Sequence, residues 1–217
     1  GLIIAGSLCG LAFGRFMKEN LKQTLMMVSG IIVLLLGMSG AMQYMLVIVN
    51  GTLQTTGPML MIISMVAGAV IGELIDLNRW ITVFGDWVKA KTGNTGDPQF
   101  THAFITASLT FTVGAMGVLG SIQDGLTGNY QTLLLKGILD GIIVMVMVSS
   151  MGKGALFSFI PVGITQWIIT AMAHIAAPLM TPSAIDNLSY VGSILIFCVG
   201  IDLIWPGKIR IANLLPA

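Results

Sequence analysis

The sequence predicts an all-α, polytopic helical membrane protein with about seven transmembrane segments. Hydrophobic residues make up 55% of the chain and charged residues only 9%, far below the roughly 25% of a soluble domain. Residues 23–72 contain no charged side chain, and this run is long enough for two helices of about 20 residues. The apolar runs are continuous rather than alternating, which favours helices over a β-barrel.

The apolar segments follow one another without room for a soluble domain, so residues 1–217 are expected to form one transmembrane domain. The first segment is too short to cross a bilayer, and the chain begins without a methionine. Residues 212–217 resemble the start of a further segment, so we expect truncation at both ends and eight spans in the full protein. The expected segments are residues 2–14, 25–48, 58–77, 101–121, 131–150, 155–178 and 188–205.

Turn-forming residues separate these segments. An uncharged, turn-rich stretch runs from Asn50-Gly51 to Thr56-Gly57, and Thr-Gly-Asn-Thr-Gly-Asp-Pro at 92–98 indicates a loop. Pro178 and Pro182 mark the break before the last segment. Residues 78–89 mix tryptophan with basic residues, which is typical of an amphipathic interfacial helix. A simple extension of the segment 58–77 explains them equally well.

The basic residues orient the spans. If the seven segments cross alternately, nine of the ten lysines and arginines lie on one side, which the positive-inside rule makes cytoplasmic. The tenth is Lys136, inside the segment 131–150. The expected topology is therefore multi-pass, with the basic loops in the cytoplasm.

Residues 120–141 carry the polar groups that most need explanation. Lys136 and Asp140 are four apart, on one face of a membrane helix, where charges are costly and usually functional. They are expected either to line a solute pathway or to pair structurally with each other. Gln123 and Asp124 precede them between glycines, either as part of a broken helix that binds a cation or polar solute or as an ordinary external turn.

The remaining charges carry weaker signals. Glu73 and Asp76 lie where the segment 58–77 leaves the membrane, and we place them at the cytoplasmic mouth of a pathway, although interfacial charges in reach of water explain them as well. Asp202 is interpreted in the same way as an interfacial charge. No metal-ligand spacing, nucleotide motif or basic patch for nucleic acid is found, so we expect no cofactor, no metal, no nucleic-acid partner and no enzyme activity.

Glycines and weak internal repeats indicate close helix packing. Gly6, Gly10 and Gly14 are spaced by four, as are Gly68 and Gly72, and such faces allow helices to approach within the chain or in a homo-oligomer. Residues 8–15 resemble 66–73, and 28–37 resemble 191–200. The second match relates segments of opposite direction, as an inverted repeat would.

Several stretches of the chain together form a pattern found in a known family: residues 68–73, 104–109, 114–116, 120–128, Lys136, 139–141, 157–158, 161–162 and 208–217. They resemble the bacterial inner-membrane family called YqgA/YdfK-like, or domain of unknown function 554. The resemblance covers nearly the whole chain and implies a multi-pass protein of the bacterial cytoplasmic (inner) membrane, without bringing an activity. The family usually has a short extra N-terminal stretch and a last apolar segment, both absent here, and Asn129 stands where an aspartate is often expected.

Two functions follow from the sequence. The first is a small transporter or channel for an ion or small polar solute, with a pathway lined by Gln123, Asp124, Lys136 and Asp140. The second is a non-transporting membrane scaffold or regulator, in which Lys136 and Asp140 are a structural pair. The distinguishing observation is whether these two side chains line a cavity or are buried against each other.

Overall fold

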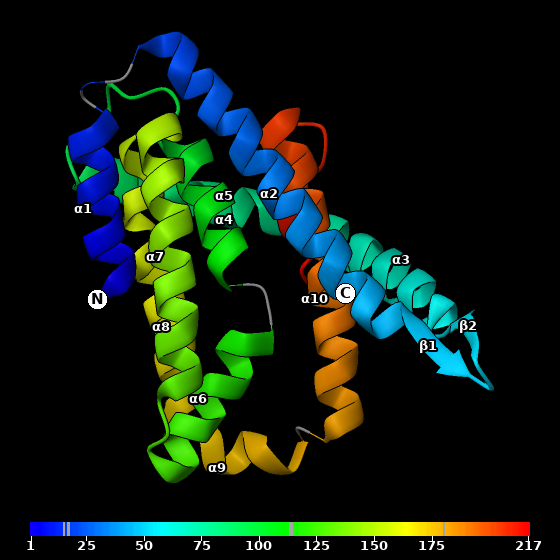
Figure 1. Cartoon of the computed structure of the whole chain (residues 1–217). Helices are drawn as coiled ribbons and strands as arrows, with labels where there is room; N and C mark the ends of the chain where they lie inside the picture. The colour runs from blue at the N-terminus through cyan, green and yellow to red at the C-terminus, as the bar shows by residue number, and fades with distance from the viewer. Residues whose placement is uncertain (15, 17, 113–114, 180) are drawn as a thin grey trace.

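The structure, a computed structural model, describes residues 1–14, 16, 18–112, 115–179 and 181–217 and consists almost entirely of helices (Figure 1). This confirms the prediction of an all-helical membrane protein. The α-helices are α1 (Leu2–Gly14), α2 (Glu19–Met45), α3 (Pro58–Ile75), α4 (Leu77–Lys91), α5 (Phe100–Thr112), α6 (Ala115–Thr127), α7 (Gln131–Met151), α8 (Phe159–Ala171), α9 (Ala173–Ala176) and α10 (Pro182–Ile204). Three short 3-10 helices are η1 (Lys153–Ser158), η2 (Ala177–Leu179) and η3 (Ile211–Leu214).

Five stretches of the described chain are long and apolar enough to cross a membrane, rather than the expected seven. They are α2 from Gln23, α3, α7, the continuous stretch of η1 and α8, and α10. A bent pair, α5 with α6, makes a sixth if it counts as one span. The helix α1 is shorter, so the count of seven is not confirmed.

The expected single segment 101–121 is two helices, and this prediction was wrong. The axes of α5 and α6 are inclined by 59°, and residues 113–114 between them lie outside the described residues. The helix α6 then continues to Thr127, so Gln123 and Asp124 lie in the second helix of a bent pair, as the broken-helix alternative expected, and not in an external turn. The chain turns later, at Gly128, whose φ of 69° is in the left-handed region that ends helices.

A short hairpin occupies the uncharged stretch after α2. Strands β1 (Leu46–Val49) and β2 (Thr52–Thr55) pair antiparallel, with Val49 opposite Thr52. Asn50 and Gly51 between them have φ of 52° and 76°, the two positive values that a type I′ hairpin turn requires. In Figure 1 the hairpin projects from the helices at the right of the view.

The helix α4 is separate from α3, so it is not a simple extension of that segment. Asp76 between them has φ of 52°, which ends one helix, and its Oδ1 accepts a hydrogen bond of 3.4 Å from the Arg79 backbone N–H. This is the N-cap interaction that satisfies a free donor of the new helix.

The longest interface joins α2 and α10, and its contacts are reciprocal. A Cβ at Gly37 would lie 2.6 Å from the Phe197 Cα, and a Cβ at Gly200 would lie 2.5 Å from the Leu34 Cα. The sequence match of 28–37 with 191–200 makes Gly37 equivalent to Gly200 and Leu34 equivalent to Phe197. The two matched segments therefore pack on each other about a local pseudo-twofold axis.

The two glycine-spaced faces are covered within the chain. Gly14 packs on Ser149 of α7, with 3.4 Å between its added Cβ and the Ser149 Cα. Gly68 packs on Ala217, with 2.6 Å between the corresponding Cβ and the Ala217 Cα. These faces were expected to pack either within the chain or in a homo-oligomer. They pack within the chain, because α7 covers one face and the segment after η3 covers the other.

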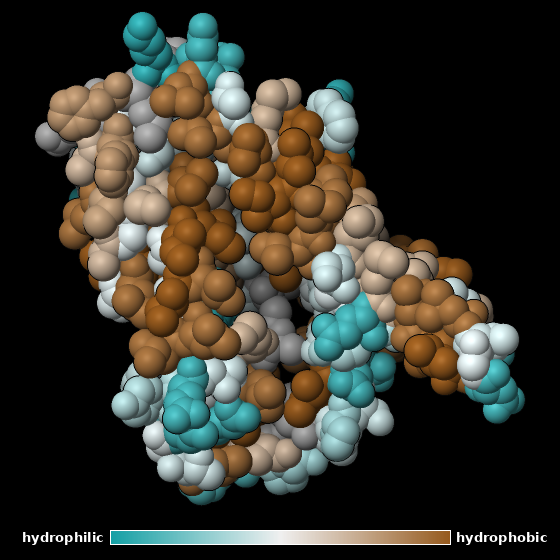
Figure 2. All heavy atoms as spheres, viewed as in Figure 1, coloured by the Kyte–Doolittle hydropathy of each residue, from teal (hydrophilic) through white to brown (hydrophobic). Residues whose placement is uncertain are grey.

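The outer surface is apolar around the middle of the helices. Figure 2 shows hydrophobic residues along the helices of this face, with hydrophilic residues gathered at the two ends. Exposed side chains include Ile63, Val66 and Leu35, each at least half exposed. Apolar exposure on this scale is what contact with lipid requires.

Candidate functional site

A buried ion pair lies halfway along α7. Lys136 and Asp140 are only 6% and 8% exposed, and the Lys136 ammonium donates to Oδ2 of Asp140. Asp140 is close to the midpoint of a helix of 21 residues, which at about 1.5 Å per residue matches the roughly 30 Å hydrocarbon core. The predicted i,i+4 pairing of these two side chains is present.

The break between α5 and α6 supplies a second partner for Lys136. The Lys136 Nζ donates a hydrogen bond of 2.9 Å to the Phe111 carbonyl, in the last turn of α5. Carbonyls in the last turn of a helix lack partners within the helix and carry its negative dipole end. The broken span therefore places a partial negative charge beside the lysine at mid-depth.

Burial of this pair is costly, and its surroundings reduce that cost. Removing an ion from water costs several kcal/mol even after the protein relaxes. The pair offsets this cost because the two charges sum to zero and Lys136 has two acceptors. Glycine also brings α6 near, since a Cβ at Gly117 would lie 3.2 Å from the Lys136 Cε.

The same two side chains also line a cavity of about 320 Å³, here called the central cavity. It lies between α7, the pair α2 and α10, and the α5–α6 break. Polar side chains join the charges on its wall, and apolar side chains form the rest. The polar members are Gln43, Tyr44, Thr110, Ser189 and Ser193, and the apolar ones are Val33, Leu36, Phe111, Met116, Leu139, Ile143 and Ile196.

A second cavity, also of about 320 Å³, reaches Asp140 from the neighbouring side of α7. It is lined by residues of α1, α7 and α8, including Leu2, Tyr130 and Gln166. Gln166 lies near Lys136 as well, because both flank the Cβ position of Gly117 within 3.6 Å. Asp140 is thus the residue shared by two cavities on neighbouring sides of one helix.

Gln123 and Asp124 do not join the buried pair. The Thr132 hydroxyl donates a hydrogen bond of 2.7 Å to Oε1 of Gln123, which ties the end of α6 to the first turn of α7. Asp124 is half-buried and lines none of the four cavities described in this section. It lies seven residues along α6 from Gly117, a rise of about 10 Å.

Glu73 and Asp76 also lie away from the central cavity. Glu73 Oε2 accepts a hydrogen bond of 3.0 Å from Arg210 Nη1, and both side chains are more than half exposed. Asp76 caps α4 as described above. Among the described residues these carboxylates therefore have local structural partners, and neither lines the central cavity.

Sequence reasoning missed a second polar cluster around Asp202. Asp202 is 6% exposed, so its interpretation as an interfacial charge in reach of water was wrong. Its Oδ1 accepts a hydrogen bond of 2.8 Å from the Gly207 N–H, and its Oδ2 lies 3.4 Å from His102 Nε2. Both residues line a cavity of about 380 Å³. Asp202 and His102 are far apart in the sequence, so no local pattern predicted that they would meet. The only available signal was a histidine near the start of the apolar segment 101–121.

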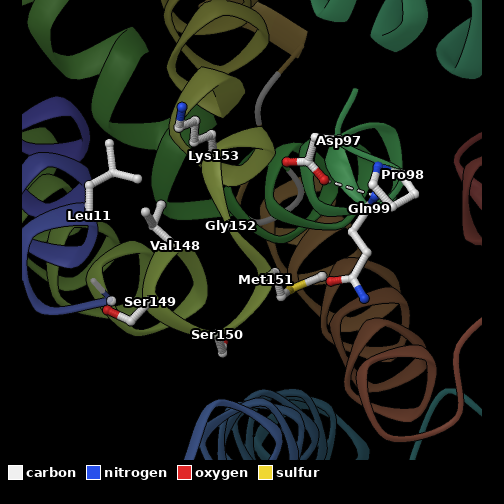
Figure 3. A pocket seen from close by; sticks show the side chains of 11 residues that line it. Leu11, Asp97, Pro98, Gln99, Val148, Ser149, Ser150, Met151, Gly152 and Lys153 are labelled. Carbon is white, nitrogen blue, oxygen red and sulfur yellow. Dashed lines mark hydrogen bonds between the residues drawn. The ribbon is translucent and has the colours of Figure 1, made fainter. Parts of the chain in front are cut away.

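The largest of the four cavities described in this section lies elsewhere, at the end of α7 (Figure 3). It measures about 520 Å³ and is lined by Asp97, Gln99, Ser150 and Lys153 among others. Asp97 Oδ1 accepts a hydrogen bond of 3.0 Å from the Gln99 backbone N–H. Lys153 is thirteen residues from Asp140, a distance of about 20 Å along a helix, so this hollow is separate from the charged pair.

The central cavity offers charged and polar side chains as partners for a small polar group. Across the described part of the chain, no group of three His, Cys, Asp or Glu side chains could hold a metal ion. What the central cavity offers is one cation, one carboxylate and several hydroxyl and amide groups at mid-membrane depth. This is the chemistry of recognition by charge and hydrogen bonds.

The fold and this site define a polytopic helical membrane protein with a buried charged pair beside a broken span. The chain belongs to the family described as "Protein of unknown function (DUF554)", whose model matches residues 1–217. This confirms the resemblance found in the sequence.

Two curated relatives match the chain, and the name of one of them describes a membrane protein. "Uncharacterized membrane protein YdfK" of Bacillus subtilis (strain 168) is 28% identical over 217 residues, covering 100% of this chain and 88% of the relative. "Uncharacterized protein YqgA" of Escherichia coli (strain K12) is 26% identical over 165 residues, covering 72% of this chain and 68% of the relative. No solved structure matches the chain.

Proposed function

We propose that the protein is a membrane transporter or channel for an ion or small polar solute, with its pathway through the central cavity. The observation that carries the proposal is that Lys136 and Asp140 both line this cavity while paired at mid-depth. Charged side chains at this depth usually serve a solute, ion or proton pathway. A broken helix whose end faces the site is a recurring feature of transporters.

The proposed pathway has Lys136 and Asp140 at its centre, because both line the central cavity. Gln123 and Asp124 belong to α6, near the turn that joins α6 to α7, and we place them at the side of this pathway. Glu73 and Asp76 lie at the end of α3 as candidate groups at the cytoplasmic mouth. The location that goes with this proposal is the bacterial inner membrane, with the basic loops in the cytoplasm.

The second candidate is a non-transporting scaffold or regulator, favoured by the direct pairing of Lys136 with Asp140. A sealed structural salt bridge also has low exposure and internal partners. It does not require a cavity beside it, however, and a cavity of about 320 Å³ is present. Self-association stays a proposal for either function, and it would use the lipid-facing surfaces rather than the glycine faces.

The experiment is flux in liposomes that contain the purified protein. We expect wild-type protein to move at least one of protons, K⁺, Na⁺ or labelled small polar solutes. Asp140→Asn should lower that flux by roughly tenfold or more, because it removes the carboxylate of the pathway. Asp124→Asn should have a smaller effect, since Asp124 lies outside the central cavity.

The neutral double variant Lys136→Met/Asp140→Leu controls for folding, because it leaves no unpaired charge. It should remain folded, as judged by gel filtration and circular dichroism, and should carry no flux. The proposal fails if the wild type moves none of these solutes, or if the folded double variant moves them at the wild-type rate.

A further inference from the structure

The central cavity presents two opposite charges side by side. Lys136 and Asp140 contribute one positive and one negative group, so the site has no net charge from this pair. Adding a lone cation or anion would leave one charge without compensation in a medium of low dielectric. A solute that itself carries both charges adds none, so the neutrality of the site favours a zwitterion.

Each charged group of the pair retains capacity for another partner. An ammonium has three N–H donors, and Lys136 uses one for Asp140 and one for the Phe111 carbonyl within the described part of the chain. The hydrogen bond of Asp140 goes to its Oδ2, and its Oδ1 has no partner among the described residues. A solute carboxylate can thus accept from Lys136 while a solute ammonium donates to Asp140.

The spacing of the two charges selects the kind of zwitterion. Because Lys136 and Asp140 are in direct contact, their partners must also be adjacent, as the ammonium and carboxylate of an α-amino acid are. The solute then lies beside the pair with its own charges in the opposite order, and the Lys136–Asp140 contact does not have to break. A zwitterion with widely separated charges does not fit this arrangement.

The remainder of the wall indicates an apolar side chain on the solute. Leu36, Ile143 and Ile196 approach the cavity from three different helices. Its volume of about 320 Å³ equals that of about ten water molecules at about 30 Å³ each. A molecule with about ten non-hydrogen atoms therefore fits, which includes aliphatic amino acids of the size of leucine.

We propose that the central cavity binds a small aliphatic α-amino acid, with its carboxylate on Lys136, its ammonium on Asp140 and its side chain among the apolar residues. This inference rests on the proposed function, because it assigns a ligand class to the same cavity. The proposed function names no solute, whereas this inference names an amino acid.

The test is isothermal titration of detergent-purified wild-type protein with leucine and two derivatives. Leucine methyl ester lacks the carboxylate, and N-acetylleucine lacks the ammonium. We expect leucine to bind at least roughly tenfold more tightly than either derivative, since each derivative loses one charge-assisted contact. Equal affinity for leucine and either derivative overturns the proposal, as does the absence of heat with leucine at millimolar concentration.

Variants test the contact between the ammonium of the amino acid and Asp140. Asp140→Asn should abolish the preference for leucine over N-acetylleucine, and a retained preference would overturn the proposal. Asp186→Asn is the matched control, because Asp186 is an exposed carboxylate on α10 and should leave the affinity unchanged. If the Asp140→Asn variant fails to fold, the affinities of the wild type for the three ligands still test the proposal.

The two proposals fail separately. Leucine binding without flux of any solute in liposomes would overturn the transport function and support the amino-acid site. Flux of another solute that depends on Asp140, without leucine binding, would overturn the amino-acid site and support transport.

Discussion

Replacing Asp140 with leucine should destabilise the protein by about 3–5 kcal/mol, because it leaves the Lys136 ammonium buried without its carboxylate. Lys136→Met should have a similar cost, since Asp140 then lacks its cation at mid-membrane depth. The measurement is the free energy of unfolding in mixed micelles titrated with denaturing detergent.

The neutral double variant Lys136→Met/Asp140→Leu should recover most of that loss. Buried ion pairs replaced by apolar residues of similar volume are often as stable as the original pair or more so. Single variants that each cost less than about 1 kcal/mol would show that the pair behaves as an exposed salt bridge and not as a buried one. Additive losses in the double variant would show that the two residues do not form a pair.

Adding a methyl group at the α2–α10 crossing should have the second-largest effect. Gly37→Ala places a Cβ 2.6 Å from the Phe197 Cα, and a backbone atom cannot move aside without shifting the helix. We expect a loss of about 1–3 kcal/mol. Gly200→Ala, its equivalent across the local axis, should cost a similar amount by the same denaturation measurement.

Gly163→Ala is the matched control for the glycine variants. It lies in α8, and nothing approaches its added Cβ within 4 Å. Its substitution should be neutral or stabilising by up to about 1 kcal/mol, because alanine favours helix over glycine. If Gly37→Ala and Gly163→Ala change stability equally, then α2 and α10 do not pack as closely as the structure indicates.

The helices long and apolar enough to span the membrane were largely predictable, because a long uncharged apolar run must form a helix in lipid. The expected segment 58–77 is α3, Pro58–Ile75, and the expected segment 131–150 is α7, Gln131–Met151. The hairpin at 46–55 was missed, although Asn50-Gly51 is a strong hairpin signal.

The break between α5 and α6 could not be read from the sequence. Residues 110–118 contain two glycines and no proline, and glycine alone is common inside membrane helices. The close approach of Gly117 to Lys136 and of Gly120 to Leu133 depends on where α7 lies. Tertiary packing therefore decides the bend.

The site was predictable where its residues are neighbours in sequence. The i,i+4 spacing of Lys136 and Asp140 predicted their pairing, and the structure has it. Ser193 and Tyr44, which share their cavity, come from α10 and α2 and gave no local signal. The contact between Asp202 and His102 was not predicted for the same reason, because these residues meet only through the packing of α10 on α5.

The central claim is that Lys136 and Asp140 line a cavity open to water-soluble solutes. The most direct measurement is labelling of the Ser193→Cys variant by a water-soluble thiol reagent, in a background of Cys9→Ser and Cys198→Ser. Ser193 lines the central cavity, whereas Val66→Cys on α3 is the control, since Val66 is 59% exposed on the apolar outer surface. The thiolate is the nucleophile that attacks such a reagent, and a cysteine forms its thiolate more readily in a polar environment than in an apolar one.

We expect the Ser193→Cys variant to be labelled in membranes and the Val66→Cys variant to stay unlabelled. A bound solute should slow the labelling of the Ser193→Cys variant, because it occupies the same cavity. Labelling of neither variant would contradict the central claim. The Lys136–Asp140 pair would then be a sealed structural salt bridge.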